Sequence, residues 1–140
     1  MASNYIDIEK ALIAALKVVD AVTPRSFPNS EIKEEDKPDG LWLQLNNLRV
    51  ESRPVTLGNR GEDNHPGLFQ IDINYPANRG TKDILLKADE IISYFTAGKS
   101  LLYNTQEVKV LSTTLDPGRY VGGYYRVSVT INYYARTQRT

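Results

Sequence analysis

The sequence predicts a two-layer α+β domain, in which two helices pack on one face of a sheet of about four strands. Two segments repeat apolar residues at helical spacing, and several others alternate apolar and polar residues with the two-residue period of a strand. Such alternation buries one face of a sheet and leaves the other polar. The expected order is helix, one or two strands, long loop, strand, helix, strand, strand. The 140 residues are expected to form a single domain, 1–140.

The first helix is expected from about Asp7 to Ala21. Its apolar residues recur at steps of three and four and therefore share one helical face: Ile8, Leu12, Ala15, Leu16 and Val19. Thr23-Pro24 ends this helix, because proline disfavours helical geometry in the residue before it. The acidic connection that follows, residues 24–40, is interpreted as a solvated loop in preference to an acidic interaction surface.

The middle of the chain predicts two strands separated by a long loop. Leu41, Leu43 and Leu45 alternate with the residues between them, in a strand that could continue to Val50 after an irregularity at Asn46-Asn47. Residues 69–75 alternate apolar and polar side chains throughout. Between them, residues 53–67 contain three glycines and two prolines and have almost no periodicity. Loops of this length are uncommon inside a compact domain and are often functional. We therefore expect residues 53–67 to be mobile in the free protein and to make contacts in an assembly, the alternative being a simple hairpin tip.

The second half of the chain predicts a helix followed by two strands. The helix runs from about Thr81 to Thr96, with an apolar stripe formed by Ile84, Leu85, Ala88, Ile91, Ile92 and Phe95. A short strand over residues 107–113 and a long strand over residues 124–135 follow. Gly122-Gly123 is expected to form a turn or bulge at the entry to the last strand, and residues 136–140 a polar, frayed tail.

Composition argues against most chemistry. There are 17 basic and 17 acidic residues, no cysteine and one histidine. The absence of cysteine excludes disulfides, thiolate metal sites and cysteine nucleophiles. His65 is the single histidine; it is expected to be exposed in the long loop, without the companions that a metal site or catalytic triad needs. We therefore expect a protein that is not an enzyme and that has no catalytic residues, metal or cofactor.

Two features of the strands suggest interactions instead. Asp72 and Arg126 both lie on polar strand faces and could form a pair if their strands are neighbours. From Arg119 onward the chain carries four arginines, no acidic residue and five tyrosines. Tyrosine and arginine are enriched in protein interfaces. The same residues also suit single-stranded nucleic acid, but the net charge of zero favours a protein interface.

Three stretches, in order along the chain, resemble a known family. They are residues 5–12 (YIDIEKAL), residues 54–58 (PVTLG) leading to residues 67–76 (GLFQIDINYP), and residues 125–127 (YRV) leading to Tyr133-Tyr134. A helix of the form ADEII, residues 88–92, lies between the last two. Together they resemble the tail-terminator-like proteins of long-tailed phages and prophages. These motifs are packing and loop patterns and include no catalytic signature.

The resemblance implies a structural protein that assembles as a ring, typically a hexamer. Such a ring caps the end of the tail tube, stops its polymerisation and provides the surface for head joining. The implied partners are other copies of the chain, the tail tube protein and the head-completion or connector proteins, with genomic DNA passing through the ring without specific binding. The implied location is the head-proximal end of the tail in the virion, after assembly in the host cytoplasm, with no membrane partner.

The predicted contact residues lie mostly in the long loop. Contacts with neighbouring subunits or with the tube are expected from Arg53, Thr56, Leu57, Arg60, His65 and Arg126. Arginine is favoured at such positions because its planar guanidinium forms strong, charge-assisted hydrogen bonds. Two alternatives remain open at this point: another head–tail joining subunit of the neck or connector, and a small nucleic-acid-binding module.

Overall fold

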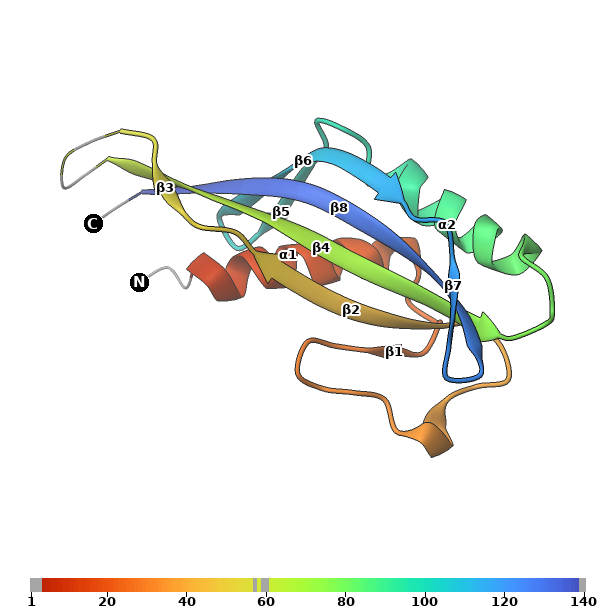
Figure 1. Ribbon diagram of the computed structural model, residues 1–140. Coiled ribbons are helices and arrows are strands. Elements are labelled where there is room, and N and C mark those ends of the chain that lie inside the picture. Colours follow the sequence, from red (N-terminus) through yellow and green to blue (C-terminus); the bar gives the residue numbers. More distant parts are fainter. Residues whose placement is uncertain (1–3, 57, 59–60, 139–140) are drawn as a thin grey trace.

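The computed structural model describes residues 4–56, 58 and 61–138. Within these residues, eight strands form one mixed sheet, whose main path has the order β1-β2-β4-β8-β6-β5. The strands on this path are β1 (Arg25–Ser26), β2 (Trp42–Arg49), β4 (Glu62–Pro76), β8 (Tyr124–Gln138), β6 (Gln106–Leu115) and β5 (Ser100–Tyr103). Two further strands lie off the path: β3 (Arg53–Pro54) pairs with β4, and β7 (Arg119–Val121) pairs with β8. Only β1 pairs in parallel, and the sheet is strongly curled (Figure 1).

Two long central strands form the axis of the sheet. β4 and β8 have 15 residues each and pair antiparallel along their whole length, from Glu62 opposite Gln138 to Pro76 opposite Tyr124. At about 3.3 Å per residue, this ribbon is roughly 50 Å long. Each outer edge of the ribbon is covered by two strands in succession, β2 then β3 on β4, and β6 then β7 on β8.

Helices α1 (Asn4–Val19) and α2 (Lys82–Tyr94) pack against one face of the sheet and share a single core with it. The apolar residues of the strands alternate, so that one face of each strand faces the helices. The largest fully buried side chains are Leu12 and Leu16 of α1, Ile84 and Ile91 of α2, Phe95 directly after α2, and Leu43, Leu45, Phe69, Ile71, Ile73, Ile131 and Tyr133 of the sheet. The opposite face of the sheet carries mainly polar residues and neither α-helix; the connection after β1, which contains the short 3-10 helix η1 (Glu34–Asp36), lies over part of it (Figure 1).

The predicted fold class is wrong in its sheet. The described residues form eight strands and a curled, mixed sheet, so the protein is mostly β instead of two helices on about four strands. Four of the strands, β1, β3, β5 and β7, have two to four residues. Strands that short cannot display a two-residue period, and they exist because a longer neighbour supplies their hydrogen bonds.

The predicted long loop is wrong at both ends. Residues 53–54 form β3, and residues 62–67 belong to β4 and pair with the end of β8. The same pairing corrects the predicted polar tail, because β8 continues through residues 136–138. The lack of alternation over residues 62–67 hid this strand. Its order comes from backbone hydrogen bonds with β8, which do not depend on an apolar pattern.

A buried ion cluster joins α1, β1 and α2. Asp20 directly follows α1, and its carboxylate accepts hydrogen bonds from the backbone N–H groups of Val22 (3.0 Å) and Thr23 (2.9 Å). Lys87 Nζ of α2 donates to the same carboxylate at 2.7 Å, and Arg25 of β1 lies 3.6 Å from it. Burial raises the pKa of Asp20, but the hydrogen bonds from Lys87 and Thr23 outweigh this and hold the pKa well below its ordinary value.

One glycine makes room for a buried tyrosine. A Cβ atom on Gly67 would lie 2.4 Å from the hydroxyl oxygen and 2.6 Å from a ring carbon of Tyr133, its partner on β8. The Tyr133 ring is buried, and its hydroxyl donates a 2.6 Å hydrogen bond to Asn47 Oδ1 of β2. The packing of Tyr133 on Gly67 and its hydrogen bond to Asn47 thus connect β8 with β4 and with β2.

Candidate assembly surface

One end of the central ribbon projects as an arm. The arm consists of β3, residues 62–66 of β4 and residues 134–138 of β8, and it extends from the sheet near the N-terminus of α1 (Figure 1). Ala135 is the last β8 residue in the apolar core, so the outer part of the arm is held by backbone pairing and polar side chains. A projecting ribbon with an exposed edge is a surface suited to contact with another protein.

His65 ties the base of the arm together. Its Nδ1 lies 2.6 Å from Ser52 Oγ, and its Nε2 lies 2.6 Å from Thr137 Oγ1. The Tyr5 ring of α1 packs edge-on against the imidazole, with 5.3 Å between the ring centroids, and its hydroxyl lies 3.2 Å from Ser52 Oγ. The histidine therefore connects four separate segments of the chain.

The expected exposure of His65 is wrong. Its side chain is buried, with 8% of the residue exposed, because β4 places it on the face that carries the helices. Burial lowers the pKa of His65, and the nearby charge of Asp63 opposes the shift. Both hydroxyl partners can donate or accept, so the neutral imidazole is fully hydrogen-bonded inside the subunit.

Two of the predicted contact residues lie exposed on the arm or directly after its strand β3. Arg53 is in β3, and Thr56 follows it. Thr56 Oγ1 accepts a 2.8 Å hydrogen bond from the Glu62 backbone N–H, which closes the β3–β4 hairpin. Leu57 and Arg60, also predicted to make contacts, lie outside the described residues.

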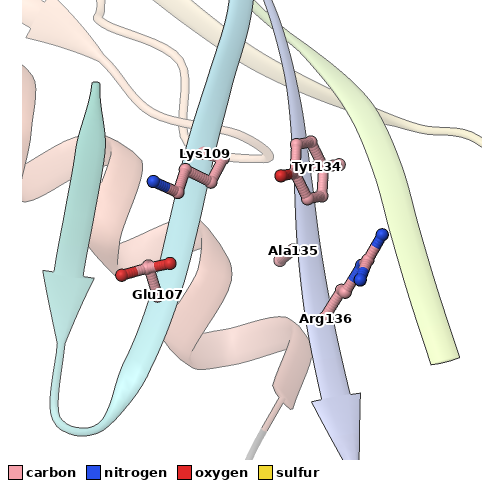
Figure 2. A pocket seen from close by; sticks show the side chains of 5 residues that line it. All are labelled: Glu107, Lys109, Tyr134, Ala135 and Arg136. Carbon is pink, nitrogen blue, oxygen red and sulfur yellow. The ribbon is translucent and has the colours of Figure 1, made fainter. Parts of the chain in front are cut away.

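A shallow pocket of about 270 Å³ lies beside the arm on the helix-free side of β6 and β8. It is lined by Glu107, Lys109, Tyr134, Ala135 and Arg136, and Figure 2 shows the side chains of the first two on β6 beside those of Tyr134 and Arg136 on β8. The Arg136 guanidinium carbon lies 5.8 Å from the centroid of the Tyr134 ring. Two members of the predicted tyrosine- and arginine-rich region therefore border this pocket together.

Arg126 belongs to a different place on the sheet. It lies on β8 next to β4, where its Nε donates to Asn74 Oδ1 at 2.7 Å and its Nη2 donates to Gln44 Oε1 at 3.2 Å. Its Nη1 lies 3.9 Å from Asp72 Oδ2. The Asp72 carboxylate also accepts a 2.5 Å hydrogen bond from Ser128 Oγ. The predicted pairing of Asp72 with Arg126 is confirmed, and the pair is largely buried, with 4% and 17% of the two side chains exposed.

The predicted contact residues therefore do not form one site. Arg53 pairs with Asn64 of β4, whereas Arg126 pairs with Asn74 of the same strand. Ten residues of strand separate the two positions, or roughly 33 Å. The sequence pattern missed this separation because it depends on the register of β8 against β4. It also missed Ser52 and Thr137, the hydrogen-bonding partners of His65, which no local motif identifies.

The described residues contain no group of three or more His, Asp or Glu side chains placed to hold a metal ion. No helix among them is long and apolar enough to cross a membrane. The features that stand out are instead a curled sheet, a projecting arm and a shallow pocket rimmed by tyrosine and arginine. Fold and surfaces together define a small, mostly β protein with a projecting arm.

Comparison with known families gives this class a specific identity. A family model described as phage tail terminator protein matches residues 7–133. The chain belongs to the phage tail terminator family, and it is a structural component of the virion with a role in tail assembly. No curated protein matches the chain.

Solved structures share the fold at low sequence identity. One is 18% identical, covers 94% of this chain and 92% of its own, and superposes with a TM-score of 0.68. Another is a chain from the virion of a native gene transfer agent particle, 11% identical, covering 98% of this chain and 100% of its own, with a TM-score of 0.59. At these identities the likeness concerns the fold.

Proposed function

We propose that the protein assembles as a ring, most simply of six copies, that binds the end of the tail tube and stops its polymerisation. The ring then provides the surface on which the head-completion or connector proteins join the tail. The observation that carries this proposal is the family match over residues 7–133. Copies of the same chain and the tube protein are the direct partners, and genomic DNA passes through the ring without specific binding.

The arm is the part of the surface best suited to reach a neighbouring subunit or the tube. It projects beyond the core, it carries the exposed Arg53, and it lies beside the pocket bordered by Tyr134 and Arg136. An exposed guanidinium can form two parallel hydrogen bonds with a carboxylate of a partner. The buried His65 supports this surface from within the subunit.

The charges of the last two strands argue against the nucleic-acid alternative. Arg126 is paired with Asp72 and bonded to Asn74, and Arg119 Nη1 donates to Asp116 Oδ2 at 2.8 Å. Arginines already engaged by carboxylates contribute little to binding phosphates. A neck or connector subunit shares the assembly role, and the ability to cap a tube separates it from a terminator.

The proposal is tested by electron microscopy of purified protein mixed with tail tubes of its phage. We expect a closed ring at one end of each tube and an arrest of tube growth. Arg53→Glu is expected to reduce capping, whereas Arg79→Glu, a reversal at another exposed arginine in the turn after the far end of β4, is expected to cap normally. Tubes that keep growing in the presence of wild-type protein would contradict a terminator, and a stable dimer on the tube would contradict the ring.

A further inference from the structure

Apolar side chains gather on the sheet at the base of the arm. Leu48 of β2 pairs with Leu68 of β4, and in the next row Pro66 of β4 pairs with Tyr134 of β8. Val50 joins this second row, because its backbone N–H donates to the Pro66 carbonyl at 3.1 Å. Directly paired residues of antiparallel strands share one face of a sheet. The five side chains therefore form one continuous surface, which we call the sheet patch: Leu48, Val50, Pro66, Leu68 and Tyr134.

The sheet patch is open to solvent. Leu48 and Val50 are 49% and 52% exposed, and the other three residues are half-buried. The adjacent Tyr133 points into the core, so the patch lies on the face opposite the two α-helices. The connection after β1 covers this face only at the other end of β2, near Trp42 and Gln44 (Figure 1). Exposed apolar side chains gathered in one place are typical of a protein interface.

Positive charge borders the sheet patch. Lys109 of β6 pairs with Tyr134, and Arg136 lies two residues further along β8 on the same face, as Figure 2 shows. Neither cation has an ion-pair partner among the described residues. Arg53 lies in the same row of the sheet as Arg136. Glu107 supplies the one negative charge of these two rows, so an acidic partner is favoured.

Helix α2 has an outer surface of complementary character. Leu85 and Leu86 are 42% and 57% exposed on it. Asp89 and Glu90 lie one turn further along the helix, next to these two leucines. Asp89 has no ion-pair partner within the part of the chain that the structure describes, and the Glu90 side chain is 48% exposed although it contacts a lysine. Lys82, one turn before the leucines, leaves a net negative charge on this helix patch of Leu85, Leu86, Asp89 and Glu90.

Another group of exposed apolar residues fits the sheet patch less well. Val18 and Val22, at the end of α1 and just beyond it, are 71% and 89% exposed. The exposed charge beside them is the positive Lys17, which would meet the cations around the sheet patch. Like charges across an interface disfavour binding. The helix patch therefore matches the sheet patch in both apolar character and charge.

We propose that the sheet patch of one copy binds the helix patch of the next copy. This inference rests on the proposed ring, because a closed ring needs two different surfaces that meet head to tail. The two patches lie on opposite layers of the fold, so each copy binds one neighbour through each patch. The leucines supply the apolar contact, and Asp89 and Glu90 approach Lys109 and Arg136 at its rim. Exposed charges of this kind mainly select the partner and its orientation.

The chain has no cysteine, so single cysteines report contacts between copies directly. Leu48→Cys and Leu86→Cys proteins are mixed on tail tubes and treated with a short thiol-specific crosslinker. We expect crosslinked dimers from the mixture and none from either variant alone, because position 48 faces position 86 of a neighbour. The matched control replaces Leu86→Cys by Leu102→Cys, a residue 69% exposed on β5, and should give no dimer. All three positions are exposed, so each variant should keep the melting temperature of the wild type.

Charge reversals test the choice of the helix patch. Asp89→Lys in the Leu86→Cys protein should lower the yield of crosslinked dimer by about two- to fivefold, the effect of losing an exposed ion pair. Arg136→Glu in the Leu48→Cys protein should restore the yield, because the two charges are then exchanged. A yield that stays low in this combination would contradict the pairing of the two patches.

Two further results would overturn the proposal. A link between two copies of Leu48→Cys would indicate a two-fold contact instead of a head-to-tail one. Protection of this cysteine from alkylation on the tube, without a link to position 86, would assign the sheet patch to the tube or connector protein. The mixtures are also crosslinked as concentrated protein without tubes. Links between positions 48 and 86 without capping would support the contact and contradict the terminator role, whereas capping by rings that lack these links would do the reverse.

Discussion

Replacing Asp20 by Asn tests how much the buried ion cluster contributes to stability. The asparagine oxygen can still accept from the Val22 and Thr23 backbone N–H groups, but Lys87 loses its buried counter-ion. The side chains of Asp20 and Lys87 are 5% and 15% exposed, so solvent screens this pair little. A hydrogen bond to a charged group contributes about 1.5–3 kcal/mol, and removing one partner of a buried pair costs about 3–5 kcal/mol.

We therefore expect Asp20→Asn to lower the free energy of unfolding by about 3 kcal/mol at pH 7, the value at which the two ranges meet. For a chain of this length the melting temperature would fall by roughly 10 °C, measured by circular dichroism or calorimetry. Glu90→Gln is the matched control. Glu90 contacts the same lysine at 3.1 Å, but 48% of its side chain is exposed, so the loss should stay below about 1 kcal/mol.

Acid pH provides an independent check. The pKa of Asp20 is lower in the folded protein than in the unfolded chain, so its contribution is complete above the unfolded value of 3.8 and is lost as pH falls toward the folded pKa. The stability difference between wild type and Asp20→Asn should narrow by about 1.4 kcal/mol for each pH unit below that value. A melting temperature within 2 °C of wild type at pH 7, as an order-of-magnitude limit, or a difference that stays constant on acidification, would refute the reasoning.

Two further variants test the base of the arm. Gly67→Ala should destabilise the protein by about 1–3 kcal/mol, since the new methyl group overlaps the buried Tyr133 ring. Gly40→Ala is its control, because a Cβ atom on Gly40 would have no other atom within 4 Å. Equal melting temperatures for the two variants would contradict the contact between Gly67 and Tyr133. Because burial lowers the pKa of His65 below 6.5, the unfolded chain binds its proton more readily, and wild type should lose stability as pH falls through 6.5 toward the folded pKa. His65→Gln should lack this pH-dependent loss of stability. If the free energies of unfolding of the two proteins change in parallel between about pH 5 and 7.5, the contribution of His65 is excluded.

Periodicity in the sequence located the long elements. The helix expected over residues 7–21 is α1, and the one expected over residues 81–96 is α2. The alternating residues 69–75, 107–113 and 124–135 all lie within strands, in β4, β6 and β8. Each of these elements buries one face against the shared core, and that burial leaves a regular apolar pattern.

The arm lacked such a pattern and was missed. Residues 62–67 read Glu-Asp-Asn-His-Pro-Gly, which has the composition of a loop. They form a strand because β8 offers them a backbone partner, residue for residue, up to Gln138. His65 is buried for the same reason, since the register turns its side chain toward Ser52 and Thr137.

The sequence by itself determined the helices, the long strands, the absence of cysteine and the family resemblance that the family match confirms. The tertiary structure alone decided the eight-stranded sheet, the arm and the burial of His65. Ser52, His65 and Thr137 illustrate the difference, because they are far apart along the chain and are joined by hydrogen bonds. A local pattern records which side of an element is buried, whereas the pairing of short strands and the meeting of polar side chains depend on neighbours that are distant in sequence.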